Sequence, residues 1–162
     1  MPDKKLLTAL KHAMRGEMDS ITVYQNAAKN STDPEVVSFF ENWANEEKQH
    51  YNYLLALYQS VSKFQELQPI QMEDSSNLIF SAEFVKRIGS SNLLFSAISV
   101  ATLLEKNAFE FYQKSAADSN DPVLKNFFEK MAFWEKHHYD ILLEIAEEAK
   151  ETYWQENRFE PF

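Results

Sequence analysis

Cysteine is absent from all 162 residues of the sequence. This absence excludes disulfides, iron–sulfur clusters, cysteine-ligated zinc and thiol catalysis from these residues. Glycine and proline are scarce, with two and five residues, whereas helix-favouring Glu, Lys, Ala and Leu are frequent. This composition predicts an all-α protein.

A basic surface and a long apolar run are lacking as well. Lys and Arg total 16 against 25 Asp and Glu, so the formal net charge is −9. We therefore expect neither nucleic acid nor a membrane as a partner. No apolar run reaches the roughly 18 residues that span a bilayer, and the N-terminal pattern, with His12, Arg15 and Glu17, is unlike a signal peptide. A cytoplasmic location is the expectation.

Four long segments have the apolar spacing of amphipathic helices. Asp33-Pro34 and Asp121-Pro122 are strong helix-start signals, because Asp caps the first turn and proline there loses no hydrogen bond. Between the second and third segments lies a polar stretch with a short helical pattern that closes at Gly89 as the residue after the helix. The predicted long helices cover 3–30, 34–60, 93–118 and 122–153.

The polar stretch 59–92 is long enough to run from one end of a helix bundle to the other. Such a connection is the long crossover of ferritin-like four-helix bundles. A linker between two domains is the alternative interpretation. We favour the crossover and a single domain over residues 1–162, because each flanking helix pair has a wide apolar face to bury.

The two helix pairs are related by an internal repeat. Residues 6–58 align with 94–146 without a gap, and 20 of these 53 positions are identical. The identical positions include both Asp-Pro start signals and the Glu and His residues described next. A duplicated helix hairpin, packed around a pseudo-two-fold axis, is therefore predicted.

Glu47-x-x-His50 recurs as Glu135-x-x-His138, each on an otherwise apolar helix face. A spacing of three residues is nearly one helical turn, so both side chains leave the same face. A carboxylate and an imidazole are costly to bury unless they are compensated. One such motif on a solvated helix face would be unremarkable, but two in register favour a metal site.

Glu17 and Glu105 occupy matching positions in the middle of the first and third helices. Together with the two Glu-x-x-His motifs they make the carboxylate pattern of a dimetal bundle, in which four carboxylates balance two divalent cations. Two glutamates, Glu47 and Glu135, are predicted to bridge. Oxygen and imidazole donors without thiolate suit iron or manganese. The predicted ligands are Glu17 with His50 on one metal, Glu105 with His138 on the other, and the two bridging glutamates.

These motifs, together with Tyr24 and Tyr112, resemble the ferritin-like diiron domain of the rubrerythrin family. The resemblance implies two iron ions without haem, a reaction with hydrogen peroxide or dioxygen, and a homodimer. Typical members carry a rubredoxin domain with four cysteines; since this sequence has none, an external electron donor is implied. Typical members also carry an extra glutamate one turn after the first on the third helix, where this sequence has Ala108.

Three further side chains are candidates for contact with the ligands. Tyr24 and Tyr112 lie two turns from Glu17 and Glu105 on the same helix faces, where they either hydrogen-bond to ligand carboxylates or serve as ordinary core tyrosines. Glu46 either accepts a hydrogen bond from His138 or lies exposed. Histidines 12 and 137 lie off the ligand faces and are predicted at the surface.

The leading functional hypothesis is a non-haem diiron oxidoreductase that reduces peroxide or dioxygen. Two alternatives remain open. One is an iron-handling or storage protein with no dedicated substrate, and the other is a sensor or scaffold that keeps the metal only to hold four helices together.

Overall fold

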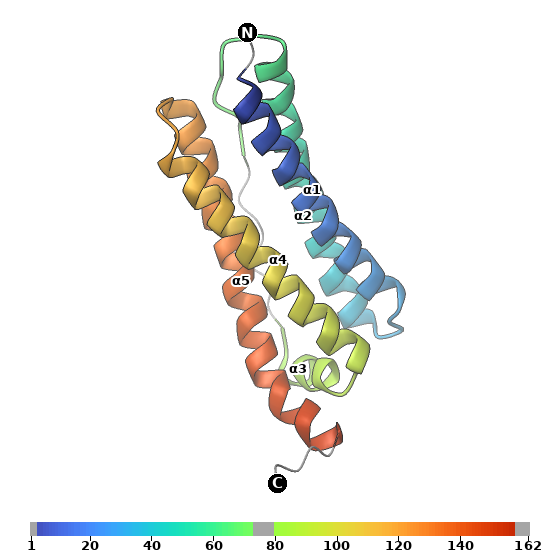
Figure 1. Ribbon diagram of the computed structural model, residues 1–162. Coiled ribbons are helices and arrows are strands. Elements are labelled where there is room, and N and C mark those ends of the chain that lie inside the picture. Colours follow the sequence, from blue (N-terminus) through green and yellow to red (C-terminus); the bar gives the residue numbers. More distant parts are fainter. Residues whose placement is uncertain (1–2, 73–79, 158–162) are drawn as a thin grey trace.

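The computed structural model describes residues 3–72 and 80–157, and every regular element within them is an α-helix (Figure 1). The all-α prediction is confirmed. The four long helices lie where the sequence predicts them, although the last continues beyond 153. The elements are α1 (Lys4–Lys29), α2 (Pro34–Ser62), α3 (Ala82–Gly89), α4 (Asn92–Ala117) and α5 (Pro122–Asn157).

Both Asp-Pro signals start helices in the way their chemistry predicts. The Asp33 carboxylate accepts hydrogen bonds from the backbone N–H groups of Glu35 and Val36, at the start of α2. Asp121 accepts the corresponding bonds from the N–H groups of residues 123 and 124, at 2.8 and 3.3 Å, at the start of α5. Each cap satisfies donors that the first helical turn leaves without a partner.

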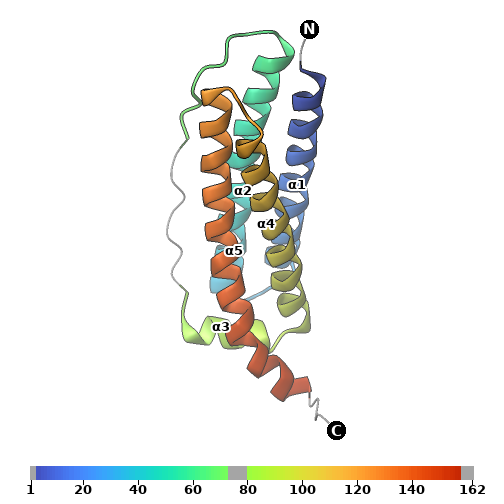
Figure 2. The ribbon, with the colours of Figure 1, turned by 60° about the vertical axis from the view of Figure 1, so that its left-hand side comes forward.

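The long helices form a ferritin-like four-helix bundle, built from the antiparallel hairpins α1/α2 and α4/α5 (Figures 1 and 2). Helix α1 packs against α2 and α4, and α4 packs against α5. The short α3 lies across one end of the bundle, against α4 and α5.

The connection between α2 and α3 is the predicted long crossover. Helix α2 ends at the end of the bundle opposite α3 (Figure 2). From there Pro69, Ile70 and Met72 lie beside the start of α5, where they share a surface pocket with Pro122 and Val123. The described residues do not include the polar run 73–77. They also do not include the apolar residues 78 and 79, which were predicted to belong to the short helix that ends near Gly89.

The expectation for Gly89 was wrong. Gly89 is the last residue of α3 rather than a left-handed residue beyond it, and Ser90 caps the helix in the right-handed region. The physical reason for glycine is close packing. A Cβ atom at position 89 would lie 2.6 Å from the Ala149 carbonyl oxygen and 2.8 Å from Cβ of Thr152. Glycine therefore lets α3 approach α5.

Buried apolar side chains form two clusters, and along every long helix the buried Glu and His residues fall between them. One cluster, which includes Trp43 and Ile98, extends to α3, and the other includes Leu10 and Phe128. Apolar packing on both sides fixes the helices around a polar centre. The buried Glu and His residues are Glu17, Glu47, His50, Glu105, Glu135 and His138.

Within the described residues, no single helix has the length and hydropathy of a membrane span. Helices α3 and α4 meet that criterion only when joined, and they are bent by 103° at the break between them.

Candidate metal centre

All six residues predicted as ligands converge in the middle of the bundle. One glutamate comes from each of α1 and α4, and a Glu-x-x-His pair comes from each of α2 and α5. Their exposed fractions are 0% for Glu47, Glu105 and Glu135 and 2% for the remaining three. Six ionisable side chains this deeply buried require strong mutual compensation.

The two helix pairs contact each other through hydrogen bonds between histidine and glutamate. Nδ1 of His50 lies 2.7 Å from Oε1 of Glu135, and Nδ1 of His138 lies 2.9 Å from Oε1 of Glu47. Within each motif the corresponding distances are longer, 3.5 Å for His50 to Glu47 and 3.7 Å for His138 to Glu135. Each histidine thus reaches across to the glutamate of the other hairpin, and the two contacts are equivalent under the internal repeat.

The donor atoms fall into two groups of four, and within each group all atoms lie within 4.8 Å of one another. Glu47 and Glu135 belong to both groups. Each group could hold a metal ion, and Glu47 and Glu135 would then be available to both sites. The two groups are Glu17, Glu47, His50, Glu135 and Glu47, Glu105, Glu135, His138.

Two buried tyrosines hold the outer glutamates. The Tyr24 hydroxyl donates to Oε1 of Glu105 at 2.6 Å, and the Tyr112 hydroxyl donates to Oε1 of Glu17 at 2.6 Å. Each bond crosses between α1 and α4, so each tyrosine orients the glutamate of the other hairpin. Both hydroxyls therefore have partners at the cluster, which was one of the two alternatives left open by the sequence.

The surroundings of the two histidines differ. Oε2 of Glu46 lies 2.6 Å from Nε2 of His138, so a carboxylate holds this ring from behind. The aligned position in the other hairpin is Trp134, whose ring stacks on His50 at 5.4 Å and 5°. The sequence alignment revealed that position 46 differs from position 134, but it gave no signal for the stacking. The two halves of the cluster are therefore chemically unequal.

Burial and charge shift the acidity of the carboxylates in opposite directions. Burial raises the pKa of Glu17 and Glu105 well above the usual value of 4.5, and the charges of Glu135 and Glu47 add to this effect. Burial acts the same way on Glu135 and Glu47, but interactions with histidine and neighbouring carboxyls outweigh it. They hold the pKa of Glu135 well below 4.5 and lower that of Glu47 to about 2.

The histidines shift in the sense that offsets these charges. Burial alone lowers the pKa of His50, but the charge of Glu135 and its hydrogen bond raise it to about 9. For His138, burial is likewise outweighed by hydrogen bonds to glutamates, and its pKa rises well above 6.5. Without metal, protonated His50 and His138 therefore offset the negative charge of the carboxylates. In a metal-loaded chain, the cations would take over this role.

The residues present fit divalent cations. Oε2 of Glu47, Glu105 and Glu135 is buried and has no hydrogen-bond partner among the described residues. A buried carboxylate oxygen without a partner is costly, and a cation between these residues removes that cost. Oxygen and imidazole donors without thiolate are the ligands of iron or manganese rather than of a closed structural zinc site.

Histidines 12 and 137 and Ala108 lie away from the cluster centre. Histidines 12 and 137 are exposed, as predicted. Ala108 lines a pocket between α1 and α4 together with Glu17.

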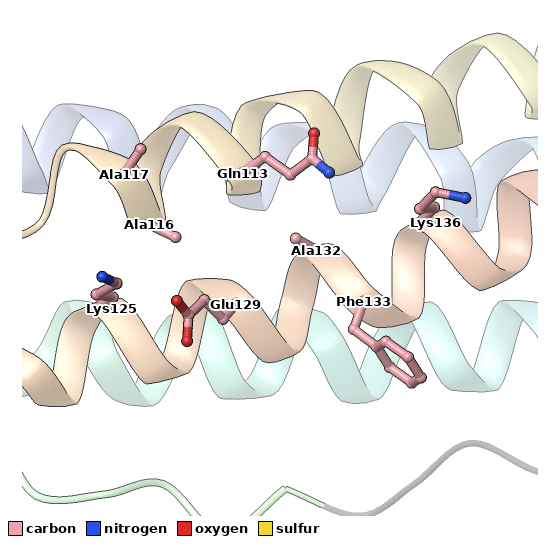
Figure 3. Close-up of a pocket in the computed structure, with 8 residues that line it drawn as sticks. All are labelled: Gln113, Ala116, Ala117, Lys125, Glu129, Ala132, Phe133 and Lys136. Carbon is pink, nitrogen blue, oxygen red and sulfur yellow. The ribbon is translucent and has the colours of Figure 1, made fainter.

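A separate surface groove of about 510 Å³ lies between α4 and α5, with Lys125 and Lys136 near its ends (Figure 3). Its lining includes none of the six clustered residues.

Comparison with known families gives one match. The model of the Rubrerythrin family matches residues 2–58, which comprise α1, most of α2, and with them Glu17, Glu47 and His50. The second hairpin, related to the first by the internal repeat, lies outside the matched range. No match was found among curated proteins or among solved structures.

Proposed function

We propose that this chain, whose residues 2–58 match the model of the Rubrerythrin family, is a non-haem diiron oxidoreductase. Its substrate would be hydrogen peroxide or dioxygen, and its electrons would come from a donor outside these residues, because no cysteine is present to form a rubredoxin-type iron site. We further propose that it works as a homodimer.

The observation that carries the proposal is the pair of overlapping four-atom groups that share Glu47 and Glu135. A structural metal would need one closed set of ligands, whereas shared carboxylates serve two ions that act on one substrate. When bound, two iron(II) ions would supply two electrons to hydrogen peroxide or dioxygen as they become iron(III). This redox role distinguishes the proposal from a scaffold.

The protein's own side chains have distinct tasks in this proposal. Glu17 and Glu105 each bind one ion, and the hydroxyls of Tyr112 and Tyr24 keep these carboxylates oriented through bonds of 2.6 Å. Glu46 fixes the His138 ring with Nδ1 toward the cluster. Such supporting contacts set ligand orientation and hence metal affinity. Apolar clusters pack along the helices on both sides of the site.

Rapid mixing tests the proposal. Protein loaded with iron(II) without oxygen is mixed with hydrogen peroxide, and oxidation is followed by absorbance. We expect oxidation faster than that of free iron(II) in the same buffer, and loss of this acceleration in Glu47→Gln/Glu135→Gln. The matched control changes Glu41 and Glu129, an aligned and exposed pair, to Gln.

Oxidation of iron-loaded wild-type protein at the rate of free iron would refute the enzyme. If the protein then also elutes from a sizing column with the apparent mass of a large multi-subunit particle, iron storage becomes the better account.

A further inference from the structure

A pocket of about 330 Å³ opens between α1 and α4 at the level of the cluster. One water needs roughly 10–15 Å³ of such space, so the pocket accommodates several waters or a small molecule. Helices α1 and α4 lie side by side across one face of the bundle (Figure 1). The pocket therefore leads inward from that face.

The pocket reaches one of the six clustered residues. Its lining includes Glu17 and Tyr112, the pair joined by the 2.6 Å hydrogen bond. Glu17 retains 2% exposure, whereas Glu47, Glu105 and Glu135 have none. Glu17 also belongs to the four-atom group that contains His50. A molecule in this pocket thus approaches the position of the metal that Glu17 and His50 would hold.

Small residues keep the pocket open. A Cβ atom added at Gly16 would meet nothing within 4 Å, and Ala108 lines the same pocket with a single methyl group. The internal repeat aligns Gly16 with Leu104, which lines the same pocket from α4. Glycine in a helix interior lowers stability. At position 16 no neighbouring atom would clash with a Cβ atom, so close packing does not explain the glycine. Its structural effect is the open space beside it.

The mouth of the pocket is polar and carries both signs of charge. His12, Arg15 and Asp19 line it and are exposed, and neither Arg15 nor Asp19 forms an ion pair within residues 3–72 and 80–157. The repeat places Val100 and Leu103 at the positions that match His12 and Arg15. Arg15 and Asp19 offset each other's charge, so the mouth has no strong field of one sign that would repel small neutral molecules or monoanions.

We propose that this pocket is the route by which a small neutral molecule or monoanion, such as hydrogen peroxide or the probe azide, reaches the metal position of Glu17 and His50. The inference rests on the proposed diiron function, because it assigns that site its entrance. Gly16 and Ala108 set the width of the route without contacting the reacting atoms.

Gly16→Leu tests the route, because a Cβ atom at this position has free space around it and the longer side chain would occupy part of the pocket. Leucine also favours the helix more than glycine does, so folding and iron content should be retained. Azide is mixed with the iron(III)-loaded protein, and its association rate is followed by absorbance. We expect slowing by about tenfold or more in Gly16→Leu. Iron removal by a small chelator should slow in parallel.

Two further variants make the test decisive. Ala108→Leu fills the same pocket from α4, and it should slow azide in the same way. Asn26→Leu places an equal side chain on an exposed position of α1 away from this pocket, and it should leave the rate unchanged.

The possible results separate the two proposals. Azide association at the wild-type rate in iron-loaded Gly16→Leu and Ala108→Leu would overturn the route and leave the diiron function standing. Loss of iron from both variants would overturn it too, because the pocket would then serve metal binding rather than access. Absence of iron from the wild type would refute the diiron function itself.

Discussion

Replacing Tyr24 by phenylalanine removes one hydroxyl group and the 2.6 Å hydrogen bond that it donates to Glu105. The ring stays in place among its neighbours Phe40 and Trp43. What remains is a buried Glu105 whose Oε1 has lost this donor and whose Oε2 has no partner among the described residues. The substitution therefore isolates the support that one hydroxyl provides to one ligand carboxylate.

The size of the effect should depend on metal. With cations bound, Glu105 is ionised, and a hydrogen bond to a charged group contributes about 1.5–3 kcal/mol. Without metal, burial raises the pKa of Glu105 well above 4.5 and favours the neutral carboxyl, for which a bond contributes about 0.5–1.5 kcal/mol. For a chain of this size, the loaded protein should lose roughly 3–12 °C of melting temperature.

Thermal unfolding followed by circular dichroism measures both values, with and without excess metal. Tyr112→Phe should behave alike, because its bond to Glu17 has the same length. Tyr139→Phe is the control: this tyrosine is half-buried, and its hydroxyl makes no hydrogen bond with described residues. A cost in the loaded protein no greater than that of the control would refute the reasoning.

Three other substitutions or conditions give independent checks. Glu46→Gln should weaken metal binding by about 10–100-fold, measured by competition with a chelator, since it removes the carboxylate behind His138; unchanged affinity would contradict this role. The metal-free chain should lose stability in denaturant titrations as pH rises from about 6.5 to 9. Folding raises the pKa of His50 to about 9, so its stabilising proton is lost through that range. An increase in stability with pH would contradict this reasoning. Gly89→Ala should lower the free energy of unfolding by about 1–3 kcal/mol, because its methyl group would meet Ala149 at 2.6 Å; a neutral effect would show that α3 is free to move away.

Helix positions were predictable because they depend on local periodicity, whereas the convergence of the cluster was predictable from the internal repeat. Asp33 and Asp121 cap their helices through contacts of two or three residues, which a sequence shows directly. The repeat supplied the long-range information: aligned Glu47 and Glu135 on apolar faces have to meet if the two hairpins bury those faces against each other. The sequence therefore predicted which residues meet, and their role as metal ligands remains a prediction.

Contacts that depend on the relative register of two helices were beyond sequence reasoning. Tyr24 follows Glu17 on the same helix, yet it bonds to Glu105 on α4, because the packing of α1 on α4 decides which carboxylate the hydroxyl reaches. The prediction for Gly89 was wrong for a related reason. Its pattern indicated a left-handed helix end, whereas its requirement is the close approach of α5, from residues sixty positions away in the chain. The stacking of Trp134 on His50 is a third such contact.

Metal content tests the central claim most directly. Protein produced with iron should contain about two iron atoms per chain by elemental analysis, and Glu47→Ala/Glu135→Ala should contain almost none. Glu41→Ala/Glu129→Ala, which removes two exposed glutamates at aligned positions, should keep the wild-type content. Wild-type protein without bound metal, or a full complement in Glu47→Ala/Glu135→Ala, would contradict the account.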